Sequence, residues 1–394
     1  MFRKQIFKLL SQFIFLFLFI FLFIQTGYNG EDLLKYPVNL FFRFDPLVFL
    51  NASIASRTIA HICLLSLIII ILSLFLGRFY CWWVCPLGTL FDYTSLRKKR
   101  LIPPNLKYYV LIFVTASSLL TLQFTWLFDP NSILIRTLSV FFVEKNQYSE
   151  IYRATAIIFF VLLMLLNLFG KRAWCNGICP LGAIYSLTAK LKVKEKKLHY
   201  ENLSLSKRSV LLSLAGAVFV LPVIKSIKNR NPFIPALRPP GADKKDFLRK
   251  CIRCGECWKV CPNKALYPAI FETGAEGIYS PVFKMRLGWC EYNCNLCGQV
   301  CPTGAIPNYP IDERKKCKIG LAEINKRVCL PWAEKTNCFV CEEHCPIPDK
   351  AIKLEIDIDN IKKPYVDKTL CVGCGICETK CPVTGDSAIV VKEL

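Results

Sequence analysis

Long apolar runs fill the first 240 residues and then give way to a cysteine-rich sequence. Four runs have the ~20 residues that a helix needs to cross the core of a bilayer, and they cover residues 9–27, 57–79, 108–128 and 151–169. A fifth run, at residues 209–224, is shorter and contains Pro222. The pattern therefore predicts a membrane α-helical bundle of four or five transmembrane helices.

The first four runs repeat one plan twice. In each pair the loop between the runs carries Phe-Asp-Pro, and the second run ends in a Cys-x3-Cys-Pro-Leu-Gly element. Self-similarity of this kind indicates two related hairpins, and packing them about a pseudo-twofold axis would bring four cysteines together. These cysteines are Cys81, Cys85, Cys175 and Cys179.

Both repeated features are candidates for chemistry. Four thiolates are enough to hold one iron–sulfur cluster; the simpler alternative is two pairs of reduced thiols where Pro and Gly stop a helix. Asp45 and Asp129, in the two Phe-Asp-Pro loops, lie near the membrane surface, where oxidation of a quinol requires a proton acceptor. The alternative for these two carboxylates is that Asp-Pro simply begins a turn.

The formal net charge of +22 is uneven along the chain. Residues 1–240 hold 28 Lys and Arg against 9 Asp and Glu, and residues 241–394 hold 23 against 20. Because the basic residues lie beside the apolar runs, we interpret them as orienting signals of membrane helices rather than as a nucleic-acid surface. Those before the first run place the N-terminus in the cytoplasm. If the fifth run also crosses, the cysteine-rich part lies outside.

Residues 191–240 connect the membrane part, residues 1–190, to the cysteine-rich part, residues 241–394. Lys207-Arg208 resembles a twin-arginine export signal with Lys in place of the first Arg, and the alternative is an ordinary basic flank. The four prolines between residues 231 and 240 indicate an extended spacer.

Seventeen of the 22 cysteines lie after residue 240, in four runs related to the bacterial ferredoxin pattern Cys-x2-Cys-x2-Cys-x3-Cys-Pro. The first and last runs match it completely, the second has one extra residue in its first gap, and the third lacks its first cysteine. Cys329 is the candidate for that missing ligand and Cys317 is the reserve. In such runs three thiolates hold one [4Fe–4S] cluster, while the fourth, next to Pro, ligates the neighbouring cluster.

This crossed pairing predicts four [4Fe–4S] sites that use sixteen cysteines once each. Site one is Cys251, Cys254, Cys257 and Cys301; site two is Cys261, Cys290, Cys294 and Cys297; site three is Cys329, Cys338, Cys341 and Cys381; site four is Cys345, Cys371, Cys374 and Cys377. Zinc sites lack the Cys-Pro position, and cysteines this close in sequence cannot form unstrained disulfides.

The fold expected for this part is α+β, with two bacterial-ferredoxin-like units in tandem. Each Cys-Pro should be followed by a short helix, as at residues 301–306, and short strands such as residues 351–358 should flank the cysteines.

The residues at 237–242, Leu-Arg-Pro-Pro-Gly-Ala, followed by Cys-Ile-Arg-Cys-Gly at 251–255, resemble the ferredoxin-type subunits NapG and MauM. Residues 1–190 resemble NapH-type membrane subunits, so the chain looks like the two joined head to tail. The resemblance implies a bacterial inner-membrane protein of anaerobic respiration that passes electrons from the quinol pool to a periplasmic partner, a cytochrome or a reductase. One departure is that residues 183–208 lack the cysteines of the cytoplasmic cluster pair in NapH-type subunits.

We therefore expect an electron-transfer protein, the quinol-oxidising part of a quinol dehydrogenase, with four [4Fe–4S] clusters and a fifth at the membrane cysteines. Its ferredoxin part should lie on the periplasmic side. No flavin, nucleotide or molybdenum-cofactor motif is present in the sequence, so we expect no terminal catalysis. Two alternatives are a reductant that matures a metal centre in a respiratory enzyme, and a ferredoxin part on the cytoplasmic side.

Overall fold

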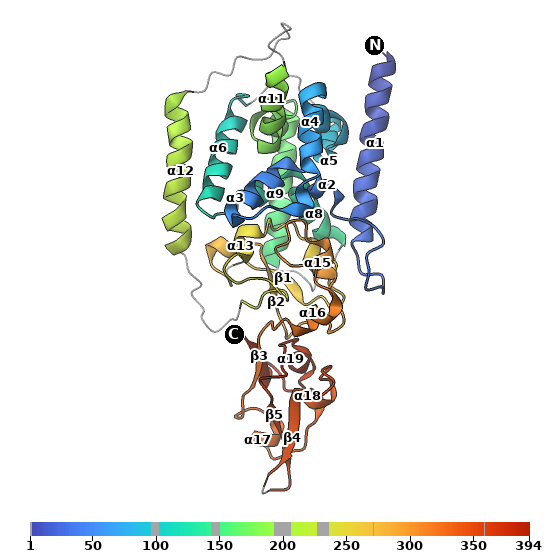
Figure 1. Ribbon diagram of the computed structural model, residues 1–394, viewed down its shortest axis with the longest axis vertical. Helices are drawn as coiled ribbons and strands as arrows, with labels where there is room; N and C mark the ends of the chain where they lie inside the picture. Colours follow the sequence, from blue (N-terminus) through green and yellow to red (C-terminus); the bar gives the residue numbers. More distant parts are fainter. Residues whose placement is uncertain are drawn as a thin grey trace.

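The computed structural model describes residues 2–95, 102–142, 150–192, 206–226, 236–270, 272–357 and 359–394. Helices of the first 226 residues stand side by side, and the cysteine-rich part extends below them, at the end opposite the N-terminus (Figure 1). The basic run at 97–100 and the start of the Pro-rich spacer, residues 231–235, lie outside the described residues.

Three helices in the described part of the chain are long and apolar enough to cross a membrane: α1 (Phe2–Gln25), α9 (Glu150–Phe169) and α12 (Lys207–Ser226). Their large apolar side chains face outward; Phe17 on α1 is 72% exposed and Phe219 on α12 is 74% exposed. Apolar patches of this kind on a protein surface mark contact with a membrane or a partner.

The second and third apolar runs form shorter helices than expected. α4 (Ser66–Leu76) follows a 3-10 turn at His61–Cys63 and ends at Gly77, whose φ of 69° interrupts the helix. α6 (Leu106–Leu119) ends before Thr121, whose φ of 68° is also left-handed. The prediction that these two runs are continuous helices was therefore wrong, and a bundle of four or five spans stays a prediction.

The remaining helices show the duplication. In the first repeat α3 (Pro46–Ser56) leads into α4 and then α5 (Pro86–Thr94); in the second, α8 (Pro130–Phe142) leads into α9 and then α11 (Pro180–Lys192). Four of these helices begin at a proline, whose fixed φ suits the first helical position and whose missing N–H needs no partner there. Shorter helices complete this part: α2 (Leu40–Arg43), α7 (Thr125–Phe128) and α10 (Ala173–Gly177).

The cysteine-rich part consists of two small α+β units. In unit one, β1 (Leu266–Pro268) pairs antiparallel with β2 (Pro281–Phe283), and α14 (Glu256–Lys259) contacts α15 (Leu296–Val300). In unit two, two antiparallel pairs occur, β4 with β5 and β3 with β6. The other elements are α13 (Phe247–Lys250), α16 (Ile311–Lys316), β3 (Leu321–Ile324), α17 (Leu330–Ala333), α18 (Val340–Glu343), β4 (Ile352–Ile356), β5 (Lys362–Val366), α19 (Ile376–Lys380) and β6 (Ile389–Lys392).

The short helices of both units lie before each Cys-Pro and not after it. α15, for example, ends at Val300, and the residues that follow Cys301 form turns that include Gly304, with a φ of 68°. The predicted helix at 301–306 was therefore wrong. The predicted strand at 351–358 corresponds to β4, and residue 358 lies outside the described residues.

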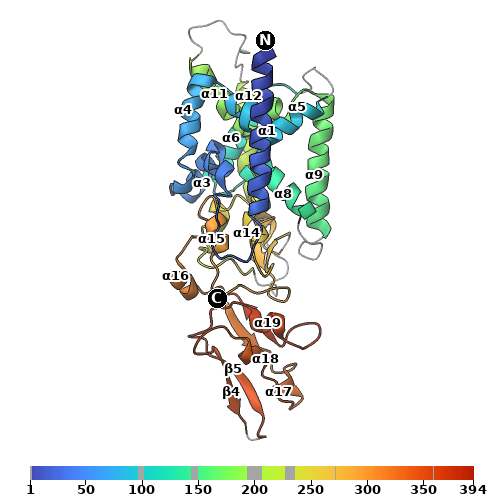
Figure 2. The same ribbon diagram turned by 90° about the vertical axis from the view of Figure 1, so that its right-hand side faces the viewer.

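Unit one is docked directly on the helical part, and unit two lies beyond it (Figures 1 and 2). The side-chain amide of Asn39 donates to the Val300 carbonyl at 3.1 Å, and the Cys63 thiol donates to the Pro302 carbonyl at 3.2 Å. The Gln123 amide donates to the Arg249 carbonyl at 3.0 Å. All three residues from the helical part are buried, so unit one forms part of the same packed structure.

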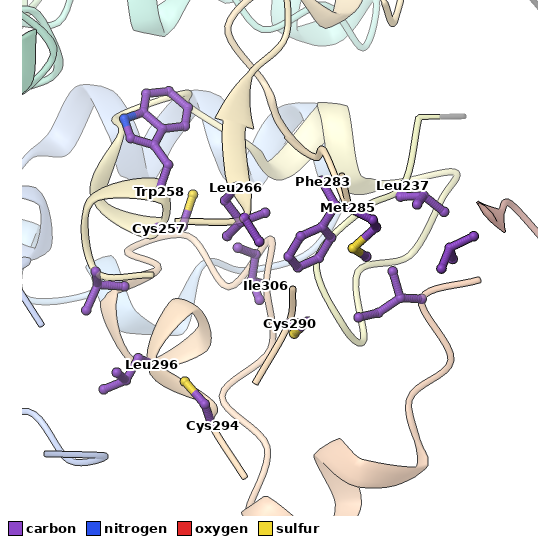
Figure 3. Close-up of a cluster of buried hydrophobic side chains, with 14 of the residues drawn as sticks. Leu237, Cys257, Trp258, Leu266, Phe283, Met285, Cys290, Cys294, Leu296 and Ile306 are labelled. Carbon is purple, nitrogen blue, oxygen red and sulfur yellow. The ribbon is translucent and has the colours of Figure 1, made fainter. Parts of the chain in front are cut away.

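The core of unit one is built around its thiols. Leu266, Phe283 and Ile306 gather between Cys257 and Cys290, the latter two belonging to different predicted sites (Figure 3). Such a small core stabilises a domain only modestly, so bound clusters are expected to supply much of its folding free energy.

Candidate iron–sulfur sites

The four cysteines of predicted site one line a single cavity. Cys251, Cys254, Cys257 and Cys301 are each 8% exposed and surround about 350 Å³ of empty space, closed on one side by Trp258. The loop that presents the first three thiols turns sharply, with Arg253 and Gly255 at φ of 50° and 101°. A Cβ on Gly255 would also meet the Trp258 ring at 3.0 Å. The donor set and the closed cavity fit a [4Fe–4S] cluster.

Predicted site three lines a second cavity of about 370 Å³, formed with Cys338, Cys341 and Cys381. The fourth thiol there is that of Cys329, which stands directly before α17. Cys317 lies elsewhere, with its thiol 3.6 Å from the Glu313 carbonyl. The structure thus places Cys329, and not Cys317, with the third run.

Several cysteines predicted for sites two and four are near one another, and their grouping into these two sites stays a prediction. Cys297 interacts electrostatically with Cys261, Cys290 and Cys294. For site four the thiol of Cys374 interacts in the same way with Cys345 and Cys371, and that of Cys377 with Cys371 and Cys374.

Thiols in these sites need compensation by positive charge before they can ionise. Burial raises the pKa of Cys290 to about 12, although the guanidinium of Arg314, whose Nη2 lies 2.6 Å from the Cys290 sulfur, acts in the opposite direction. Metal ligation requires thiolates. These buried thiols therefore keep their protons without a cluster and would lose them when a cluster binds.

The two units are joined through their ligand loops. The amide N–H of Cys290 in site two donates to the carbonyl of Cys374 in site four at 2.8 Å. Gly375 of unit two packs so tightly against unit one that a Cβ there would strike the side chain of Met285. Sites two and four are therefore neighbours across the junction of the two units.

The four membrane cysteines also come together, all of them buried. Cys179 interacts electrostatically with Cys81, Cys85 and Cys175. In both repeats the second cysteine caps a helix: Gly88 N–H donates to the Cys85 sulfur and Gly182 N–H to the Cys179 sulfur, each at 3.4 Å. Pro and Gly of this element therefore begin α5 and α11, which contradicts the interpretation that they merely stop a helix.

Two arginines beside these cysteines were missed by the sequence reading. Arg78 and Arg172 each stand three residues before the first cysteine of their element. Each donates across to the other repeat: Arg172 Nη1 to the Cys81 carbonyl at 2.9 Å, and Arg78 Nη2 to the Cys175 carbonyl at 3.3 Å. Arg172 also binds Asp92 at 2.5 Å. Their equal spacing in the two repeats was the available signal.

The predicted quinol carboxylates meet as a buried pair. Asp45 caps α3 by accepting from the amides of Leu47 and Val48, at 2.8 and 3.2 Å, and Asp129 accepts from the Ser132 amide at 2.7 Å. Both are fully buried. Burial, with the charge and hydrogen bond of Asp129, raises the pKa of Asp45 well above its ordinary value. A buried pair of carboxyls of this kind favours a state in which one of them keeps its proton.

Known families match both parts of the chain. A family described as a 4Fe-4S binding domain matches residues 60–104 and 152–198, which contain the two Cys-x3-Cys elements. A 4Fe-4S dicluster domain matches residues 250–305, and another 4Fe-4S binding domain matches residues 364–383. No solved structure matches the chain.

Curated relatives carry the description ferredoxin-type protein. The methylamine utilization ferredoxin-type protein MauM of Methylobacillus flagellatus is 34% identical over 211 residues, covering 52% of this chain and 86% of that protein. The ferredoxin-type protein NapG of Haemophilus influenzae is 32% identical over 217 residues, covering 52% of this chain and 76% of its own length. The chain belongs to the MauM- and NapG-type ferredoxin family of iron–sulfur electron-transfer proteins.

Proposed function

We propose that this chain joins a NapH-type membrane part to a MauM/NapG-type ferredoxin part, and that it passes electrons from a quinol to a redox partner outside the membrane. The observation that carries the proposal is the docking of unit one on the helical part. Ile252 and Cys254 of site one pack in the same apolar core as Cys81, Cys85, Cys175 and Cys179.

The residues that would hold the clusters are the twenty cysteines of the five sites. A [4Fe–4S] cluster, when bound, exchanges one electron at a time, so several of them suit a donor such as a quinol, which releases two electrons and two protons as it becomes a quinone. The protein contributes dry, fixed surroundings: every cysteine of site one and of the membrane site is less than 10% exposed.

The order of the sites in space indicates a direction. Site one faces the helices, site two touches site four through Cys290 and Cys374, and unit two forms the far end (Figure 2). Three of the four cysteines of site three, Cys338, Cys341 and Cys381, are partly exposed. An exposed last site at the far end suits contact with a soluble electron acceptor.

The proposed location is the bacterial inner membrane, with the ferredoxin part in the periplasm. α12 begins at the N-terminal side of the helical part and ends beside unit one, so it joins opposite ends of the bundle (Figure 1). Lys8, Lys107 and Arg172 lie in the half that holds the N-terminus, in keeping with a cytoplasmic side rich in positive charge. Four or five crossing helices complete this arrangement.

The test is reduction of the purified chain in liposomes by a quinol under anaerobic conditions. Bleaching of the iron–sulfur absorbance should follow mixing, while dithionite defines full reduction. If dithionite reduces the chain and quinol does not, the proposal is wrong, and the role of a reductant in metalloenzyme maturation takes its place. Protease treatment of spheroplasts, whose inner membrane is intact, checks the side: digestion of the ferredoxin part only after the spheroplasts are lysed would contradict a periplasmic location.

A further inference from the structure

A cavity of about 240 Å³ lies where the helical part meets unit one. Its wall comes from α7, α8, the first turns of α9 and the loop at residues 278–279 of unit one. This volume lies just below the usual range of small-molecule sites, roughly 300–1,000 Å³, so the cavity suits a single ring rather than a larger ligand. Neither Asp45 nor Asp129 is among its lining residues.

The wall combines aromatic rings with one buried cation. The rings of Trp126 and Tyr152 both meet the ring of Tyr279 edge to face, with centroids 5.4 and 5.1 Å apart. The guanidinium of Arg136 lies 5.0 Å from the Trp126 ring and 5.6 Å from the Tyr279 ring, and it is only 5% exposed. The Tyr279 hydroxyl is hydrogen-bonded to that of Thr155.

This combination selects for a flat ring with oxygen atoms. Aromatic edges and faces contact a planar ring, and hydroxyl and guanidinium groups can donate to its carbonyl oxygens or orient its hydroxyls. Arg136 is held by its Nη2 donating to the Trp126 carbonyl at 2.5 Å and its Nε donating to the Ser132 carbonyl at 3.1 Å. The cation is thus fixed in place before a ligand arrives.

The cavity borders the surface that faces lipid. Thr155, which lines it, is exposed, and on the same helix Ile151 and Ile158 are each 57% exposed. These residues belong to α9, which is long and apolar enough to cross a membrane. A ligand dissolved in the bilayer can therefore reach the cavity beside α9 without passing through water.

The same cavity adjoins site one. The ring of Tyr152, in its wall, lies 6.0 Å from that of Trp258, which closes the cavity of site one. Arg136 interacts electrostatically with Cys254, a ligand of site one, and on its other side with Asp129. Two aromatic rings in contact, Tyr152 and Trp258, lie between the two cavities.

We infer that this cavity binds the ring of a lipid-soluble quinol. The inference rests on the proposed function and locates its substrate. When a quinol is oxidised to a quinone, its two O–H bonds break, two electrons pass singly to one-electron iron–sulfur acceptors, and two protons leave. Asp129 interacts electrostatically with Arg136, and neither it nor its partner Asp45 lines the cavity, so both are placed to hold a proton rather than to contact the ring.

A matched pair of substitutions on α9 tests the site. Ala156→Phe puts a phenyl group into the cavity, whereas Ala154→Phe adds the same group to an exposed position of the same helix that does not line the cavity. Because packed sites tolerate added volume poorly, Ala156→Phe should slow reduction by quinol at least about tenfold. Quinol should reduce the Ala154→Phe chain at the parent rate. Dithionite should fully reduce the parent chain and both variants.

Photolabelling with an azido-quinone in liposomes provides a readout that does not depend on electron transfer. Label should appear on peptides from α8, α9 or residues 278–279, and Ala156→Phe should abolish it. Equal quinol rates in both variants, or label confined to other peptides, would overturn the site while leaving the proposed function intact. A parent chain that quinol cannot reduce would instead overturn the proposed function. Label displaced by phospholipid headgroups but not by quinone would assign the cavity to lipid.

Discussion

The sharpest test of the membrane cysteine site uses its two glycines. A Cβ added at Gly88 would lie 2.8 Å from the carbonyl oxygen of Cys81, and one at Gly182 would lie 2.9 Å from that of Cys175. Both contacts are closer than real Cβ atoms allow, and each strikes the backbone of a predicted ligand. Neither oxygen can move without moving the thiol loop, so Gly→Ala here acts on the site itself.

The expected change in free energy on each Gly→Ala substitution follows from two opposed effects. Alanine favours a helix over glycine by up to about 1 kcal/mol, whereas forcing a methyl group into a packed site typically costs about 1–3 kcal/mol. Gly216→Ala in α12 is the matched control, because its Cβ would meet only Phe113, at an ordinary 3.9 Å. We therefore expect Gly216→Ala to be neutral or slightly stabilising and each of the other two changes to distort the cysteine site.

The assay is iron and acid-labile sulfide per chain, measured on anaerobically purified protein. If the membrane cysteines hold a [4Fe–4S] cluster, a chain carrying Gly88→Ala and Gly182→Ala should contain about four irons fewer than the Gly216→Ala chain. The ferredoxin sites, which these glycines do not touch, should stay loaded. Equal iron content in the two chains would refute a cluster at the membrane cysteines or the tight packing that we describe.

Three further changes probe other contacts. Cys329→Ser should lower the iron content by about one to four atoms, because it removes a ligand of site three, whereas Cys317→Ser should leave it unchanged; the reverse result would assign the ligand to Cys317. Arg172→Met breaks a buried ion pair, which costs about 3–5 kcal/mol, and a loss below about 1 kcal/mol in denaturant unfolding would contradict that strength. Because burial and the charge of Asp129 raise the pKa of Asp45, a protonated carboxyl band should persist in infrared spectra at neutral pH, fade as the pH rises, and be weaker in Asp45→Asn.

The grouping of the ferredoxin cysteines was accessible from sequence because cluster chemistry dictates their spacing. A [4Fe–4S] cluster needs thiols at fixed short intervals, and the crossed pairing left one consistent assignment for sites one, two and four. Cys329 was harder, since it lies nine positions before Cys338. Its choice over Cys317 depends on the backbone path through α17, which no local pattern encodes.

Helix boundaries and long-range contacts were harder to predict from the sequence. Hydropathy does not register a single left-handed residue, so the ends of α4 at Gly77 and of α6 before Thr121 were not foreseen. The Asp-Pro sequence correctly indicates a turn, and the same carboxylates also cap helices. That Asp45 and Asp129 meet follows only from the packing of the two repeats against each other.

The two repeats also differ in the residues around the proposed quinol cavity. Asp45 and Asp129 are equivalent and 84 positions apart, so Phe42 and Ala52 in the first repeat correspond to Trp126 and Arg136 in the second. Both first-repeat residues are buried in the apolar core and offer no hydrogen-bonding groups. In the first repeat α3 contacts α13 of unit one, while in the second α8 and α9 leave the cavity open beside Tyr279. Duplication thus provides the symmetric cysteine and carboxyl sites, and the asymmetric docking of unit one places the proposed quinol cavity beside the second repeat.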